Sequence, residues 1–177
     1  MILYMKRLIF GIALIFAAVP FCCGQEISWR MITQLVRSTF PDAKQLSTAA
    51  LAHWLNDTSR PQPVLLDARN PDEFKVSHLK NAVPINPVLQ DFSALPLSKH
   101  TPVVVYCSVG YRSAKVVSRM QKAGFTNVQN LEGSIFKWKN EGRPVYRDGR
   151  EVQDVHPYDQ TWGALLKRTY RTYQARN

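Results

Sequence analysis

Apolar and polar positions follow one another along the chain in blocks that predict strands and helices in turn. Strands are predicted at residues 64–66, 82–85, 103–106 and 127–130, and the continuous apolar runs at 64–66 and 103–106 indicate buried ones. Helical spacing of apolar side chains predicts helices at residues 70–76, 113–123 and 135–140, and a helical turn at residues 88–95. This alternation is typical of the α/β class, with a mostly parallel central sheet of about five strands and helices on both faces.

Helical patterns also lie on either side of this block. Ser47 can cap a helix that carries Leu51, Trp54 and Leu55. Before it, an amphipathic helix that ends before Pro41 is predicted from the spacing of Ile27, Met31, Ile32, Leu35 and Val36. Near the end of the chain, a helix over residues 161–173 is predicted from the stripe of Trp162, Leu165, Leu166, Thr169 and Tyr170.

The first two dozen residues have the pattern of an export signal. Lys6 and Arg7 precede an apolar run of about 14 residues, which is short for a membrane span of about 20. We therefore expect residues 1–24 to be a cleaved signal peptide and the protein to be periplasmic or secreted. The alternatives are a retained membrane anchor and, less favoured, lipidation of Cys22 or Cys23.

The composition is that of a folded, globular protein. The chain has 177 residues, of which 45% are hydrophobic and 20% charged, and this balance is typical of globular proteins. Its net charge is +10, and basic residues gather near the C-terminal end. We interpret them as a solvated helix face, and expect no nucleic-acid partner and no membrane contact unless the N-terminal segment is retained or lipidated.

The candidate chemistry lies where the most apolar predicted strand runs into a loop and a helix, at residues 103–113. Cys107 follows the strand directly, and Gly110 in the loop permits backbone conformations that a side chain would hinder. Loop N–H groups and the helix N-terminus favour a thiolate at this point. Cleavage after Gly24 would also leave Cys107 as the only one of three cysteines.

The length of this loop separates two kinds of chemistry. Four residues lie between Cys107 and Arg112, whereas protein tyrosine phosphatases have a Cys-x5-Arg loop whose wider ring of N–H groups fits a phosphoryl group. The smaller loop favours a terminal sulfur atom on the cysteine. Sulfur transfer is therefore the preferred interpretation, and a phosphatase or arsenate reductase is the alternative.

Three motifs in order resemble signatures of the rhodanese family of sulfurtransferases. They are Leu65-Leu66-Asp67-Ala68-Arg69 with Glu73-Phe74 and His78-Leu79, then the loop at residues 107–113, then Leu131-Glu132-Gly133-Ser134 with Trp138, Gly142, Pro144 and Val145. Ser134 departs from the family, which usually has a second glycine there. The resemblance implies a rhodanese-like three-layer domain at residues 45–146. The family does not account for the helical patterns outside it, which we expect to form an N-terminal helical extension at 25–44 and a C-terminal extension with a basic helix at 147–177.

The resemblance also implies roles for the site residues. Cys107 would take the outer sulfur of a donor such as thiosulfate as a persulfide and pass it to a thiol or cyanide. Arg112 would bind the oxyanion of the donor, and the other substrate-binding residues would be Ser108, Val109, Gly110, Tyr111 and Ser113. Structural support would come from Asp67, Arg69 and His78, while Glu73 would lie on a helix face with Arg69 as a candidate partner and Trp138 would belong to the core.

The partners follow from this chemistry. No metal or organic cofactor is required, and the four histidines are scattered along the chain. We expect a small anionic sulfur donor and a thiol acceptor, which could belong to a protein. The alternative from a different class is a persulfide carrier or binding module that docks a partner protein through the terminal helices.

Overall fold

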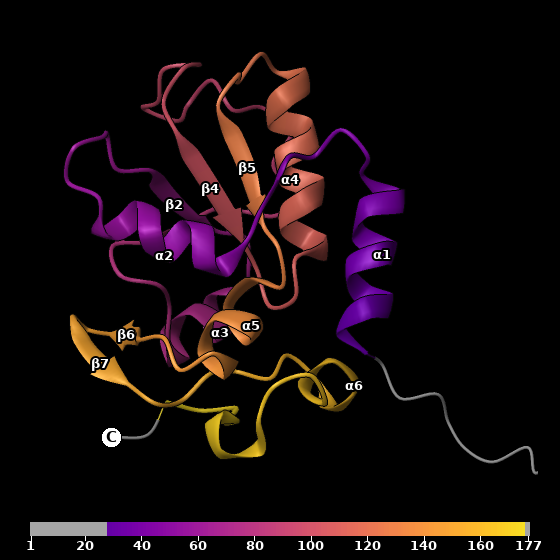
Figure 1. The fold of residues 1–177 in the computed structure, drawn as a ribbon, viewed down its shortest axis with the longest axis vertical. Helices are drawn as coiled ribbons and strands as arrows, with labels where there is room; N and C mark the ends of the chain where they lie inside the picture. The colour runs from indigo at the N-terminus through magenta and orange to yellow at the C-terminus, as the bar shows by residue number, and fades with distance from the viewer. Residues whose placement is uncertain (1–27, 176–177) are drawn as a thin grey trace, which may run out of the picture.

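The structure, a computed structural model, describes residues 28–175 of the chain (Figure 1). The predicted export signal and the two cysteines near its end lie outside the described residues, so export stays a prediction. Within residues 28–175, no helix combines the length and the apolar character that crossing a membrane requires.

Five parallel strands form the central sheet of residues 28–175, which confirms the predicted fold class. They are β1 (Gln45–Leu46), β2 (Val64–Asp67), β3 (Val83–Pro84), β4 (Val103–Tyr106) and β5 (Val128–Leu131). Their spatial order is β1-β5-β4-β2-β3, and every neighbouring pair is parallel. All four side chains of β4 are buried, as expected for a central strand that is covered on both faces.

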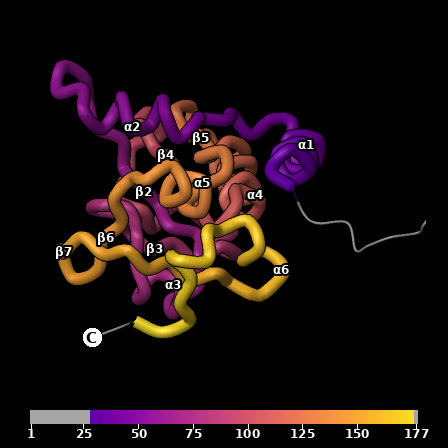
Figure 2. The backbone as a smooth tube through the Cα atoms, turned by 60° about the horizontal axis from the view of Figure 1, so that its bottom comes forward, coloured from indigo at the N-terminus to yellow at the C-terminus, as the bar shows by residue number. Residues whose placement is uncertain are grey.

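Helices cover this sheet on both sides (Figures 1 and 2). They are α1 (Trp29–Thr39), α2 (Thr48–Asn56), α3 (Pro71–Val76), α4 (Tyr111–Lys122) and α5 (Ser134–Asn140). α4 packs on β4 and β5 and α1 packs on α4, while α2 lies on the other side of the sheet and contacts α5. The side chain of Ser47 accepts the N–H of Ala50 and caps α2, as predicted.

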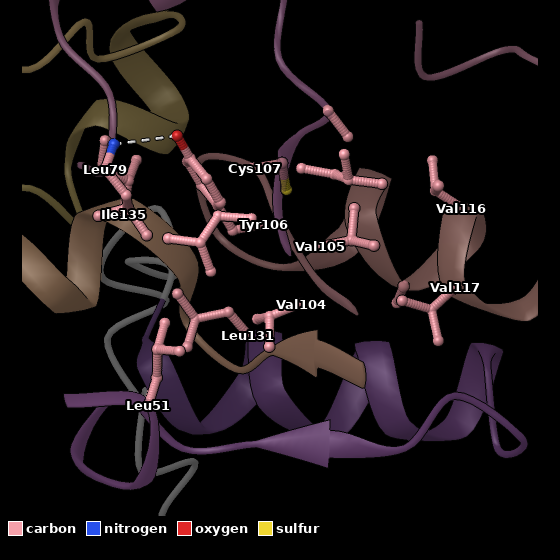
Figure 3. Packing of buried hydrophobic residues seen from close by; sticks show 14 of the residues in the cluster. Leu51, Leu79, Val104, Val105, Tyr106, Cys107, Val116, Val117, Leu131 and Ile135 are labelled. Carbon is pink, nitrogen blue, oxygen red and sulfur yellow. Dashed lines mark hydrogen bonds between the residues drawn. The ribbon is translucent and has the colours of Figure 1, made fainter. Parts of the chain in front are cut away.

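The core fills the space between the sheet and these helices (Figure 3). Val116 and Val117 reach it from α4, and Leu51 reaches it from α2. The buried hydroxyl of Tyr106 accepts the N–H of Leu79 at 3.0 Å, so the polar end of this ring is satisfied. Cys107 follows Tyr106 directly, so the candidate nucleophile is attached to a closely packed part of the core.

The C-terminal extension does not form the predicted helix over residues 161–173. Its elements are the hairpin β6 (Val145–Arg147) and β7 (Arg150–Val152), the short helix α6 (Gln160–Gly163) and the 3-10 helix η1 (Arg168–Tyr170). The Asn140 side chain donates to the carbonyl of Leu165 and accepts the N–H of Lys167. These tertiary hydrogen bonds take backbone groups that a continuous helix would need, so the apolar stripe alone was misleading.

Residues 88–95 form turns and no helix, which corrects the helical turn predicted there. The side chain of Asn86 accepts the N–H of Val88, and the side chain of Asp91 accepts the N–H of Ser93. Short polar side chains that bind the backbone two residues later compete with the helical hydrogen-bond pattern.

Candidate active site

The backbone of the Cys107 loop is held by the start of α5. The carbonyl oxygens of Cys107 and Ser108 accept the N–H groups of Ile135 and Phe136 at 3.2 and 3.1 Å. The N–H of Cys107 donates to the side chain of Ser134 at 3.0 Å, and that hydroxyl donates to the carbonyl of Leu131. Ser134, which departs from the family pattern, therefore anchors the loop through its hydroxyl.

Two donors contact the sulfur of Cys107. The N–H of Gly110 lies 3.2 Å from Sγ and the hydroxyl of Ser113 lies 3.4 Å from it. Gly110 reaches this position with a φ of +106°, a conformation that favours glycine, and α4 begins at the next residue. The sequence pointed to backbone N–H groups alone, whereas the structure adds a side-chain hydroxyl.

Burial, charge and hydrogen bonding together decide the pKa of the Cys107 thiol. Burial raises it, because a thiolate loses solvation in the interior, and the residue is only 1% exposed. The positive charge of Arg112 and the hydrogen bonds from Ser113 and Gly110 lower the pKa by more. The net result is a thiol that ionises more readily than that of an ordinary cysteine.

The pH dependence of Cys107 alkylation tests this balance. The midpoint of the rate of iodoacetamide reaction against pH should lie below the pKa of a free cysteine, about 8.5. Arg112→Ala should raise the midpoint, because the charge that favours the thiolate is removed. The alkylated fraction, measured by intact mass after timed reaction at each pH, gives the rate and hence the midpoint. Lys115→Ala, which removes an exposed charge from the same helix, should keep the wild-type midpoint; an unshifted Arg112→Ala profile would contradict the assignment.

Glu73 lies on helix α3, as expected, but it is paired with Arg112 and not with the candidate partner Arg69. Nη1 and Nη2 of Arg112 each donate to one carboxylate oxygen of Glu73 at 2.7 Å. The hydroxyl of Ser108 donates to the same carboxylate at 2.7 Å and accepts from Nη2 of Arg112 at 2.9 Å. Glu73 is buried because α3 points it under the loop, where it offsets the charge of Arg112.

Asp67 and Arg69, which were expected to give structural support, form a buried ion pair at the end of β2. The Arg69 guanidinium binds both oxygens of Asp67, with a shortest distance of 2.7 Å, and both side chains are 0% exposed. It also donates to the carbonyl of Ser77, which ties β2 to the end of α3. The pair lies outside the set of residues that line the pocket at Cys107.

His78 and Trp138 also lie away from the nucleophile. The ring of His78 stacks on Phe74 with 4.0 Å between centroids, and its Nδ1 lies 3.2 Å from the carbonyl of Phe74. Trp138 is buried and donates from Nε1 to the carbonyl of Pro144, which agrees with its predicted place in the core. Both residues therefore make structural contacts.

A pocket of about 290 Å³ opens onto Cys107. Its lining combines the loop and the start of α4 with both extensions, and consists of Leu35, Cys107, Ser108, Val109, Tyr111, Arg112, Tyr158 and Trp162. Sequence reasoning missed Leu35, Tyr158 and Trp162 as site residues. Leucine, tyrosine and tryptophan do not by themselves indicate a catalytic or binding role, and no local sequence pattern connects residue 35 or 158 with residue 107.

Within residues 28–175, histidine, cysteine and carboxylate side chains do not gather into a metal site. Among residues 28–175, no group of three or more histidine, cysteine, aspartate or glutamate side chains could hold a metal ion. Cys107 is a free, buried thiol, and residues 28–175 contain no other cysteine. The site offers the chemistry of an activated thiol in a pocket that is lined mostly by apolar and aromatic side chains.

Comparison with known proteins relates the chain to one family. The model of the rhodanese-like domain matches residues 48–141, over half of the 177 residues. The chain is 37% identical over 93 residues to a tRNA uridine(34) hydroxylase of Wolbachia pipientis wMel, covering 49% of this chain and 33% of that protein. It is 30% identical over 124 residues to a protein of the same name from Teredinibacter turnerae, covering 66% and 38%. The chain thus spans about a third of the length of these curated relatives.

Solved structures agree with this relationship. A rhodanese-like domain protein from Staphylococcus aureus is 25% identical with a TM-score of 0.51, and the match covers 59% of this chain and 98% of that one. A thiosulfate sulfurtransferase from Pseudomonas aeruginosa has a TM-score of 0.54 at 22% identity, covering 77% of this chain and 26% of that one. The second likeness concerns the fold alone.

Proposed function

We propose that this chain, which belongs to the rhodanese-like domain family, is a sulfurtransferase that acts through a persulfide on Cys107. The observation that carries the proposal is the environment of the Cys107 sulfur. The sulfur accepts hydrogen bonds from Gly110 and Ser113, and Cys107 lines a pocket. The pKa of its thiol is lowered. A thiolate held in this way is a nucleophile that is ready for attack at sulfur.

The proposed reaction has two steps. The Cys107 thiolate attacks the outer sulfur of a sulfane-sulfur donor, such as thiosulfate; the new S–S bond forms while the donor's S–S bond breaks, and sulfite leaves with the bonding electron pair. An acceptor thiolate, or cyanide, then attacks the outer sulfur of the persulfide and restores the Cys107 thiolate. Gly110 and Ser113 stabilise the negative charge on Sγ before attack, and Arg112 adds a positive charge close to it.

Mass spectrometry tests the first step. After incubation with thiosulfate and removal of excess donor, the intact protein should gain the mass of one sulfur atom, and peptide mapping should locate it on Cys107. Addition of a thiol such as glutathione should remove it, because the acceptor takes the outer sulfur. No adduct with thiosulfate, an organic thiosulfonate or a persulfide donor would sink the proposal. Phosphate release from an aryl phosphate, without any adduct, would favour the phosphatase alternative.

A second candidate follows from the curated relatives. They carry the name tRNA uridine(34) hydroxylase and are up to 37% identical to this chain, although the chain spans about a third of their length. The experiment is nucleoside analysis of tRNA incubated with the protein, dioxygen and a reductant, because hydroxylation takes one oxygen atom from the oxidant and the other must leave as water. Hydroxylated uridine would favour this candidate, whereas unchanged tRNA together with a Cys107 persulfide would favour sulfur transfer to other acceptors.

A further inference from the structure

The pocket over Cys107 is walled by parts of the chain outside the family match, which covers residues 48–141. Leu35 comes from α1, and Tyr158 and Trp162 come from the C-terminal extension. With Val109 and Tyr111 from the loop, they surround the sulfur with aliphatic and aromatic side chains. Both extensions therefore contribute to the site itself.

In this pocket the polar side chains of Arg112 and Ser108 are already engaged with Glu73. The guanidinium of Arg112 donates to both oxygens of Glu73, and the hydroxyl of Ser108 donates to the same carboxylate. The ring of Tyr158 also covers Arg112, with 4.7 Å from the guanidinium carbon to the ring centroid. A dianion that enters the pocket would lose solvation and find a charge that Glu73 already offsets, which is unfavourable.

The turn that presents the two aromatic residues is held in place. Tyr158 has a φ of +67°, which is rare for a residue with a side chain, and its N–H donates to Nδ1 of His156 at 3.0 Å. Asp159 accepts the N–H of Trp162 at 2.8 Å and caps α6. Gly163 packs so closely that an added Cβ would lie 2.9 Å from the side chain of Pro157. The wall is therefore a defined feature of the fold.

We propose that this pocket selects sulfur donors whose leaving group carries a compact aromatic ring over donors of the same charge whose leaving group lacks one. This substrate class rests on the proposed sulfurtransferase function. The pocket is large enough for an aromatic ring, because a cavity of about 150 Å³ accommodates benzene and this pocket has a volume of about 290 Å³. Leu35 and Trp162 act as specificity-determining residues that contact the ring.

Two thiosulfonates of equal charge serve as probes. Benzenethiosulfonate and methanethiosulfonate both transfer their terminal sulfur to the Cys107 thiolate, and the corresponding sulfinate leaves with the electron pair of the broken S–S bond. Only the first carries a ring. Because intrinsic reactivity differs between them, the quantity to measure is the change in kcat/KM that each substitution causes for each donor.

Trp162→Ala should lower kcat/KM for benzenethiosulfonate about tenfold and that for methanethiosulfonate less than about twofold, because the lost contact is with the ring. Leu35→Ala should also lower kcat/KM more for benzenethiosulfonate than for methanethiosulfonate, but by a smaller factor than Trp162→Ala. The matched control for Leu35→Ala is Met31→Ala, one turn earlier on α1. Met31 is 43% exposed and Leu35 is 45% exposed, but only Leu35 lines the pocket. Met31→Ala should leave both donors unchanged.

The outcomes separate this inference from the proposed function. Equal losses for both donors, or no loss for either in Leu35→Ala and Trp162→Ala, would overturn the selectivity for the ring while sulfur transfer stands. Absence of a Cys107 persulfide from either donor in the wild type would overturn the sulfurtransferase function itself. Circular dichroism checks the fold of Trp162→Ala; if this variant does not fold, the comparison of Leu35→Ala with Met31→Ala decides the question alone.

Discussion

Cys107→Ser should lower sulfur transfer by at least about a thousandfold and leave no protein-bound sulfur after donor treatment. A serine hydroxyl at this position is a far weaker nucleophile towards sulfur and cannot form a persulfide. The measurement is kcat/KM for thiocyanate formation from thiosulfate and cyanide, together with intact mass. Retained transfer in this variant would show that another group is the nucleophile.

The same variant should keep its fold, so that the loss is one of chemistry. The serine oxygen can accept the hydrogen bonds that the sulfur now accepts from Gly110 and Ser113. Its free energy of unfolding should therefore stay within about 1 kcal/mol of the wild type. Ser113→Ala is the companion variant: it keeps the nucleophile and removes one donor, and should lose about tenfold or less in kcat/KM.

Glu73→Ala should be the most destabilising single substitution at the site, with a loss of about 3–5 kcal/mol in the free energy of unfolding. The Glu73 side chain is 2% exposed and accepts hydrogen bonds from Arg112, Ser108 and the backbone of Asn70. Its removal leaves a largely buried guanidinium without its counter-charge. Urea unfolding followed by circular dichroism measures the loss, against a total stability of about 5–15 kcal/mol.

Asp72→Ala provides the matched control for this substitution. Asp72 lies next to Glu73 on α3, but its side chain is 85% exposed and forms a surface pair with Lys75 at 3.3 Å. Asp72→Ala should lower the free energy of unfolding by no more than about 0.5 kcal/mol, because surface ion pairs contribute little to stability. Equal losses in the two variants would contradict the role assigned to the buried carboxylate.

The stability that Glu73 contributes should also depend on pH. Burial raises the pKa of its carboxyl, but the hydrogen bonds and charge of Arg112 lower it by more, so the folded pKa lies below the ordinary value for glutamate. The contribution is therefore fully present above the ordinary pKa and is lost as the pH falls through the folded pKa. The difference in unfolding free energy between the wild type and Glu73→Ala should shrink across that acidic range.

The sequence by itself determined the parts of this protein that depend on neighbouring residues. The apolar runs located β2 and β4, because a buried strand shows in consecutive side chains. The Ser47 cap and the left-handed Gly110 were likewise readable, because each acts within a few residues of its own position. The Cys107 loop belongs to this class, since strand end, loop and helix start are contiguous in the chain.

Only the tertiary structure decided which distant groups meet at Cys107. Glu73 and Arg112 are 39 residues apart, and no spacing rule connects them. Asn140 interrupts the predicted terminal helix through hydrogen bonds to residues 25 and 27 positions away. Leu35 and Trp162 enter the pocket from opposite ends of the described chain. The physical reason is that a local pattern records the faces an element can bury, whereas the contacts it makes depend on how the whole chain packs.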